Sequence, residues 1–368
     1  MTDLQKDLIY LLSCAVNGIT PDKDKIRAMD LETLYKFSKW HTVRAAVHTA
    51  LRSVGVNDKS FHQAYNKAVR KNVMLDVERT AILEDFERRG IWYMPLKGSI
   101  LKELYPENGM REMADNDMLY DASKQQEVMQ IMLGYGYTAE SVGKTHHDVY
   151  MKPPVLNFEL HTFLFGKTSD FYQYYCNPKR LMLPDEGKKY GYHLSDEDFY
   201  VYMTAHEYKH FSGGGTGIRS LLDCYVYCKN KGYTLDWGYI SEQCKQLEIA
   251  DFEKERRELA VKVFSSDTLL DLSDAETDLL MYYLTAGTYG TIENSITKKL
   301  KHQSKTQYIL SNMFPNLYYM KRSVDFVRIF PVLYPVGIVY RWGRILVKRQ
   351  NYLSVILKVM KKHDNKKV

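Results

Sequence analysis

Two aspartates with one residue between them, Asp115 and Asp117, are the side chains whose spacing most clearly suggests chemistry. They begin the segment DNDMLYD, which is typical of a β-strand. Alternate side chains of a strand point to the same face, so we expect the two carboxylates to lie side by side. Neighbouring carboxylates repel one another unless a cation neutralises them, and oxygen ligands suit Mg²⁺ or Mn²⁺. The pair therefore predicts a divalent metal site.

A third acid, Glu159, interrupts the apolar segment VLNFELHTFLF, which is also typical of a strand. A charge in such a run is costly without a partner or a metal, and Asn157 and His161 share its face. Three carboxylates on neighbouring strands can hold two metal ions about 3.5–4 Å apart, which activate an attacking oxygen and neutralise a triphosphate. We expect Asp115, Asp117 and Glu159 to be metal ligands and catalytic residues.

A phosphate-binding turn is predicted at Lys97, Gly98 and Ser99, which lie between an expected strand and an expected helix. Glycine lets the backbone approach a phosphate closely, and a helix N-terminus offers unpaired N–H groups. Arg111 follows in a loop. Its guanidinium either grips a phosphate through two parallel hydrogen bonds or belongs to a surface loop, and the sequence leaves both interpretations open.

These segments together resemble a known family. A Gly-Ser turn, an acid-x-acid strand and a later strand acid are similar to the signature of DNA polymerase β-type nucleotidyltransferases. More narrowly, a group of uncharacterised bacterial nucleotidyltransferases resembles the segments MPLKGSILKELYP, REMADNDMLY, NFELHTFLF, AHEYKH and IRSLLDCYVY. The resemblance covers roughly residues 80–240, and the linked motifs are more specific than any one alone.

The resemblance implies Mg²⁺-dependent transfer of a nucleoside monophosphate from a nucleoside triphosphate to an acceptor, with the three strand acids as metal ligands. It also implies that polar residues of two later helices line the nucleotide site or pack against the α/β unit. These residues are His206, His210, Arg219 and Asp223. The acceptor is left open between a sugar phosphate, another small molecule, a protein hydroxyl and an RNA end.

The stretch His206-Glu207-Tyr208-Lys209-His210 also matches the HExxH pattern of zinc hydrolases, in which two histidines bind zinc and the glutamate is the general base. No His or Glu about twenty residues beyond His210 supplies a third ligand, and the glycine-rich SGGGTG follows directly. These observations disfavour zinc, and a zinc hydrolase is kept as an alternative function.

The elements that must position these residues form a small α/β unit between helical regions. Apolar residues recur at helical spacing up to about residue 90. The order expected next is strand 91–96, helix 99–105, strand 115–121, helix 123–136 with Ser123 as its N-cap, and strands 147–151 and 155–165. Further helices are expected at 196–211, 217–232, 236–247 and 251–264.

The predicted fold class is therefore α+β, with a small polymerase β-type core and a mixed sheet flanked by N-terminal and C-terminal helical regions. The expected domain limits are 1–89 for the N-terminal helical region, 90–165 for the nucleotidyltransferase core, 190–320 for the C-terminal helical domain and 321–368 for a basic, apolar tail.

The composition favours a cytoplasmic protein. Its five cysteines are scattered without a CxxC pair, and the segment MTDLQKDLIYLLSCAVNG is a poor signal peptide. The formal charge of +6 is uneven, because residues 321–368 carry twelve Lys and Arg against two Asp, a net of +10 that leaves −4 for the rest. The longest charge-free run there, IFPVLYPVGIVY, falls short of the ~20 residues of a membrane span.

A basic tail of this kind contacts nucleic acid or an anionic membrane surface, or it is simply solvated. A non-catalytic protein that binds a membrane surface or a partner through this tail is the second alternative function.

Overall fold

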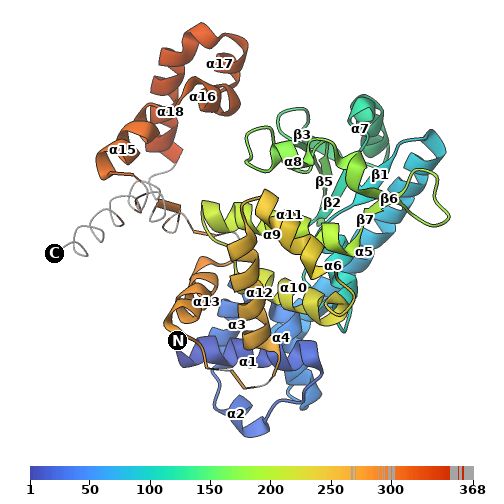
Figure 1. The fold of residues 1–368 in the computed structure, drawn as a ribbon, viewed down its shortest axis with the longest axis vertical. Helices are drawn as coiled ribbons and strands as arrows, with labels where there is room; N and C mark the ends of the chain where they lie inside the picture. Colours follow the sequence, from blue (N-terminus) through green and yellow to red (C-terminus); the bar gives the residue numbers. More distant parts are fainter. Residues whose placement is uncertain are drawn as a thin grey trace. The chain divides into compact units, whose positions relative to one another are not determined.

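The computed structural model describes residues 1–348 except 267, 270, 289, 292, 294, 297–299, 301 and 302, together with residues 355 and 359. The chain divides into two compact units (Figure 1). The first comprises residues 1–208 and 217–288, and the second comprises residues 209–216 and the described residues of 289–368. The domain limits expected from the sequence stay predictions.

The first unit begins with five helices (Figure 1), which are α1 (Asp3–Asn17), α2 (Lys23–Arg27), α3 (Leu31–Trp40), α4 (Arg44–Ser53) and α5 (Lys59–Arg89). Short polar side chains fix their starts, because the carboxylates of Asp22, Asp30 and Asp58 accept backbone N–H groups of the first turns of α2, α3 and α5. Gly90 ends α5 with φ +70°, a conformation that glycine adopts without strain. The helical pattern of the sequence is thus confirmed.

A five-stranded mixed sheet follows. Its strands are β1 (Tyr93–Pro95), β2 (Asn116–Tyr120), β3 (Thr138–Ser141), β4 (His147–Lys152) and β5 (Leu156–His161), in the order β1-β2-β5-β4-β3. β2 and β5 are parallel, and the other pairs are antiparallel. The parallel register places Asp117 opposite Glu159 and Leu119 opposite His161. The predicted α+β fold class with a mixed sheet between helical regions is confirmed.

Two local predictions were wrong. Ser123 does not cap a helix. Its N–H and Oγ donate to Asp121 Oδ1 at 3.0 and 2.7 Å inside the 3₁₀ turn Ala122–Lys124, and α7 (Gln125–Gly134) begins after that turn. The strand expected to reach residue 165 ends at His161, because the next backbone N–H groups turn to the carbonyl oxygen of His146.

One face of the sheet is covered by α5 and α7. Buried residues of β2 and β5 at even positions pack there against Leu75, Ile82 and Phe86 of α5. Asn116 is fully buried on this face, where its side chain donates to the Leu75 carbonyl at 2.9 Å and accepts from Arg79 at 2.9 Å. The middle residue of the DND segment therefore anchors β2, while the acids on either side are free to face the other way.

The opposite face packs against part of the helical region that completes the first unit. These elements are α6 (Gly98–Leu101), α8 (Tyr172–Tyr175), α9 (Asp196–Gly213, to residue 208), α10 (Ile218–Lys231), α11 (Trp237–Gln246), α12 (Ala250–Phe264) and α13 (Asp274–Ala286), with the hairpin β6 (Met182–Pro184) and β7 (Tyr192–Leu194). Leu96, Leu101 and Leu119 share one buried core with aromatic residues of α8 to α10.

The second unit is a small helical module. Its elements are α15 (Lys305–Met313), α16 (Leu317–Ser323), α17 (Asp325–Ile329), a 3₁₀ turn (Pro331–Leu333) and α18 (Tyr334–Lys348). Met320, Val324, Val327 and Ile338 form its core. Across the described part of the chain, no helix is both long and apolar enough to cross a membrane. Much of the predicted basic tail, at 349–354, 356–358 and 360–368, lies outside the described residues.

Candidate active site

The strand acids lie on the face of the sheet opposite α5. Asp117 is buried in β2 and pairs in register with Glu159 of the neighbouring parallel strand. His161 lies two residues beyond Glu159 on the same face, and ligand atoms of the three residues all lie within 4.8 Å of one another. The alternation of strand side chains predicted this grouping from the sequence.

Asp117 is held as a carboxylate by two donors. Lys97 Nζ and His161 Nε2 contact Asp117 Oδ1 at 2.6 and 2.8 Å. Burial raises the pKa of Asp117, but the charge of Lys97 and the hydrogen bond with His161 outweigh burial, so the pKa lies well below its usual value. Both of these contacts are made to Oδ1 rather than to Oδ2.

Asp115 precedes β2 and has the opposite electrostatic character. Burial, followed by the negative charges of Asp117 and Glu159, raises its pKa from 3.8 to about 7, although Lys97 and Arg219 act to lower it. Crowded carboxylates that resist ionisation are the donor set that a hard divalent cation neutralises. The residues therefore fit Mg²⁺ or Mn²⁺.

The turn before α6 is tied to the strand acids through Lys97. Its backbone has φ +49°, which is uncommon for a residue other than glycine, and strained backbone clusters at functional sites. The N–H of Leu96 donates to the carbonyl oxygen of Asp117 at 3.0 Å, and Ser99 Oγ donates to the carbonyl oxygen of Leu96 at 2.8 Å. The turn is thus fastened directly to β2.

Gly98 is required by packing rather than by its backbone angles. A Cβ atom at this position would lie 2.6 Å from Arg111 Nη1 and 2.7 Å from Met113 Cε. Any larger residue would have to displace the side chains of Arg111 and Met113.

Arg111 forms a buried ion pair with Asp223 of α10. Its Nε and Nη2 atoms donate to the two carboxylate oxygens at 2.8 and 3.0 Å, and Tyr105 donates its hydroxyl to Asp223 Oδ1 at 2.7 Å. Arg111 is only 9% exposed, so the surface-loop interpretation was wrong. The structure brings two of the predicted site residues together, and a contact of either with phosphate stays a prediction.

The loop between Arg111 and Asp115 is fastened by residues that sequence reasoning missed. Glu112 accepts from Arg44 Nη2 at 2.6 Å and from the N–H of Ala45 at 3.2 Å. Lys71 of α5 donates to the Ala114 carbonyl at 2.7 Å, and Arg219 donates to the Glu112 carbonyl at 3.2 Å. In the sequence Arg44 and Lys71 look like cations of solvated helical faces, so no local signal could have found them.

The HExxH segment does not present its glutamate to a metal. Glu207 is buried, with Arg256 Nη1 donating to Oε2 at 2.9 Å and the hydroxyl of Tyr283 donating to Oε1 at 2.7 Å. His206 belongs to the first unit and is half-buried, while His210 belongs to the second unit and is exposed. The groups of described residues that could hold a metal include neither histidine.

Tyr202 is a further residue that the sequence analysis missed. Its side chain lies on α9 with no exposed surface, and its hydroxyl has no hydrogen-bond partner among the described residues. Burial, then the charges of Lys97, Asp117 and Glu159, act on its pKa, which lies above its usual value. The residue is therefore a neutral buried donor beside the acids.

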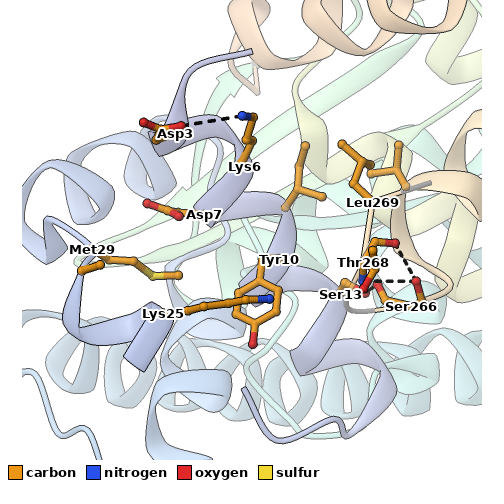
Figure 2. Close-up of a pocket in the computed structure, with 13 residues that line it drawn as sticks. Asp3, Lys6, Asp7, Tyr10, Ser13, Lys25, Met29, Ser266, Thr268 and Leu269 are labelled. Atoms are coloured by element: carbon orange, nitrogen blue, oxygen red, sulfur yellow. Dashed lines mark hydrogen bonds and ion pairs between the residues drawn. The ribbon is translucent and has the colours of Figure 1, made fainter. Parts of the chain in front are cut away.

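A cavity of about 620 Å³ lies elsewhere in the first unit, lined by α1, α2 and residues near the end of α12 (Figure 2). Lys25 lies over the ring of Tyr10 there, 4.6 Å from its centroid. None of the residues predicted to bind metal or nucleotide lines this cavity. The candidate site is therefore identified from its charged side chains, and this cavity is not part of it.

A mixed sheet that carries an Asp-x-Asp strand beside a strand glutamate, between helical regions, is the arrangement of a nucleotidyltransferase. Residues 27–265 match the model of a family described as uncharacterised nucleotidyltransferase, and the chain belongs to this family. No curated protein and no solved structure gives a significant match. The family match confirms the resemblance and the enzyme class, and it includes both strands that carry the acids.

Proposed function

We propose that the protein transfers a nucleoside monophosphate from a nucleoside triphosphate to an acceptor, with Mg²⁺ or Mn²⁺ held by Asp115, Asp117 and Glu159. The observation that carries this proposal is that ligand atoms of Asp117 and Glu159, on neighbouring strands, lie within 4.8 Å of each other. Asp115 interacts electrostatically with both, and burial together with their charges raises its pKa to about 7. Bound divalent ions would supply neutralisation of the triphosphate and of the attacking oxygen.

The residues divide the chemistry among them. The acceptor oxygen attacks the α-phosphorus, the bond from that phosphorus to the bridging oxygen breaks, and pyrophosphate leaves. Glu159, which is partly exposed, accepts the proton of the acceptor hydroxyl. Asp115 and Asp117 hold the cations that the triphosphate requires.

In the proposed reaction, Lys97 exchanges its contact with Asp117 for a contact with the phosphates. Its pKa is raised above the usual value, since the charge and hydrogen bond of Asp117 outweigh burial, and it stays cationic. When a divalent cation neutralises Asp117, Lys97 becomes available to the phosphates, with the backbone of Gly98 and Ser99 beside it. Arg219, Arg111 and Asp223 support this arrangement, and His206 of the same unit is kept as a predicted nucleotide contact.

The test is nucleotide binding by the double variant Asp115→Asn/Asp117→Asn. Calorimetry at pH 8, where Asp115 is ionised, should show that Mg²⁺-dependent triphosphate binding falls at least tenfold, while circular dichroism shows that the variant is folded. The matched control is Glu140→Gln, which removes an exposed acid of β3. Unchanged nucleotide affinity in the folded double variant would overturn the proposal.

We also propose that the second unit attaches the enzyme to an anionic membrane surface, since the described part of this unit combines exposed apolar side chains with basic residues. This function is compatible with catalysis in the first unit.

A further inference from the structure

Three histidines gather at the edge of the carboxylate site. His146 and His147 lie at the start of β4, and His161 ends β5. Their ring centroids are separated by 4.7 Å (His146 to His147), 5.2 Å (His147 to His161) and 5.7 Å (His146 to His161). One ligand nitrogen from each of the three lies within 4.8 Å of the others.

This spacing suits three ligands of one transition-metal ion. With Zn–N bonds of about 2.0–2.1 Å and tetrahedral angles, the centroids of two imidazole ligands lie about 5.2 Å apart. The three observed centroid separations bracket this value. Small side-chain rotations would bring the nitrogens to bonding distance.

The hydrogen bonds of His161 leave a lone pair unused. When its Nε2–H donates to Asp117 Oδ1 at 2.8 Å, the neutral imidazole carries its lone pair on Nδ1. That Nδ1 atom is buried and has no hydrogen-bond partner among the described residues. A buried acceptor without a donor is costly, and a cation would satisfy it.

His147 repeats the pattern. Its Nε2 atom lies 3.9 Å from Glu159 Oε2, and its Nδ1 atom is also buried without a hydrogen-bond partner in the described part of the chain. Metal-bound histidines characteristically direct their second nitrogen to a carboxylate, which fixes the tautomer and the orientation of the ring. His161 therefore already has that arrangement through its hydrogen bond with Asp117, whereas His147 lies near Glu159 beyond hydrogen-bond distance.

The backbone holds the group in place. His147 and His161 are directly opposite in the antiparallel pair of β4 and β5. The carbonyl oxygen of His146 accepts from the N–H of Thr162 at 2.9 Å and from its hydroxyl at 3.1 Å. A Cβ atom on Gly166 would lie 3.2 Å from His146 Nδ1, so glycine gives this ring its room.

We propose that His146, His147 and His161 form a binding site for a zinc-class divalent ion, with an open fourth position for water or an oxygen ligand. Imidazole ligands favour such ions over Mg²⁺, which prefers oxygen. This site is distinct from the carboxylate site for Mg²⁺ or Mn²⁺, although Asp117 and Glu159 border both. The inference stands on the histidine geometry and does not require nucleotidyl transfer.

The test is Zn²⁺ binding by the full chain after removal of metal, measured by competition with a chromophoric chelator in the presence of excess Mg²⁺. The wild-type protein should bind one Zn²⁺, and His146→Ala should weaken this binding at least tenfold. His146 is the informative position because it does not belong to the group Asp117, Glu159 and His161. The matched control is His193→Ala, which removes an exposed histidine and should leave the affinity unchanged.

Two further measurements test the zinc site without relying on the folding of His146→Ala or on nucleotide binding. Co²⁺ added to the wild-type protein should give the visible bands of a four-coordinate ion with nitrogen ligands. This measurement needs no variant, so it does not depend on whether His146→Ala folds. Asp115→Asn, which impairs the proposed nucleotide site, should retain Zn²⁺ binding, so the two proposals fail separately. Absence of saturable Zn²⁺ binding, or equal affinity in folded His146→Ala, would overturn the inference.

Discussion

Asp115 and Asp117 are chemically different although they are two residues apart. Asp117 is stabilised as an anion by Lys97 and His161, whereas Asp115 meets burial and two negative charges. Groups of one site whose pKa values are driven apart in this way commonly divide a function between them. Here the pKa of Asp117 lies well below its usual value, and Asp115 ionises as the pH rises through about 7.

Asp115 therefore gives folding stability a specific pH dependence in metal-free buffer. Its pKa is 3.8 in an ordinary setting and about 7 in the folded protein, so the folded state binds more protons between these values. Stability consequently falls as the pH rises from about 4 to about 7. Asp115→Asn lacks this penalty, so its melting temperature should exceed that of wild type by a few degrees at pH 8 and by little at pH 4.

Thermal denaturation with a chelator present checks this expectation across the pH range. Glu140→Gln should show no comparable pH-dependent difference, because Glu140 is exposed. A difference between Asp115→Asn and wild type that stays constant from pH 4 to pH 8 would contradict the assignment of the titration to Asp115.

The positions of individual side chains could be predicted from the sequence where they follow the two-residue period of a strand. Alternation along a strand was enough to place Asp117, Glu159 and His161 on one face. The contact of His161 with Asp117 depends on the parallel pairing of β2 with β5, and that of Lys97 depends on the pairing of β1 with β2, which no local pattern encodes. The buried hydroxyl of Tyr202 was equally hidden, because a tyrosine in an aromatic-rich helix looks like core.

The elements that were missed lack the patterns on which prediction depends. β3 is short and its residues are largely exposed, so it shows no alternation of apolar and polar side chains. The long helices and the strands that carry the acids were recognised because their apolar residues repeat regularly. Where a segment is fixed by contacts distant in the sequence, as the loop before β2 is, periodicity gives no signal.

The ion pair of Arg111 with Asp223 joins that loop to α10. Removing one partner of a buried pair leaves an uncompensated charge and costs about 3–5 kcal/mol, whereas replacing both by apolar residues costs much less. We therefore expect Asp223→Ala to lower the free energy of unfolding by about 3 kcal/mol or more. The double variant Arg111→Met/Asp223→Leu should recover at least half of this loss.

Chemical denaturation of the wild type, Arg111→Met, Asp223→Leu and the double variant Arg111→Met/Asp223→Leu forms a double-mutant cycle that measures the coupling. Asp196, whose ion pair with Lys231 at 2.9 Å is well exposed, provides the control, and Asp196→Ala should change stability by less than about 1 kcal/mol. Additive effects of the single variants would show that the pair does not fasten the loop.

At the scale of the whole molecule, the family match ends at residue 265, and the second unit contributes no residue to the matched region beyond 209–216. Its described residues expose large apolar side chains, which are Ile329 (62%), Phe330 (58%), Val332 (83%), Val336 (56%) and Val339 (65%). Arg328, Arg341 and Arg344 lie on the same helices. Apolar side chains beside cations suit the interface of an anionic membrane.

Membrane attachment of this kind is expected to depend on both apolar contact and charge. The full chain should co-sediment with vesicles that contain phosphatidylserine and bind much less to vesicles of phosphatidylcholine alone, with the difference reduced by salt. The double variant Val332→Asp/Val336→Asp should lose at least tenfold in affinity for the anionic vesicles. Val261→Asp, which changes a 41% exposed valine of the first unit, is the matched control and should bind like wild type. Equal sedimentation of all three proteins, or binding to RNA with none to the anionic vesicles, would exclude the membrane as the partner of this unit.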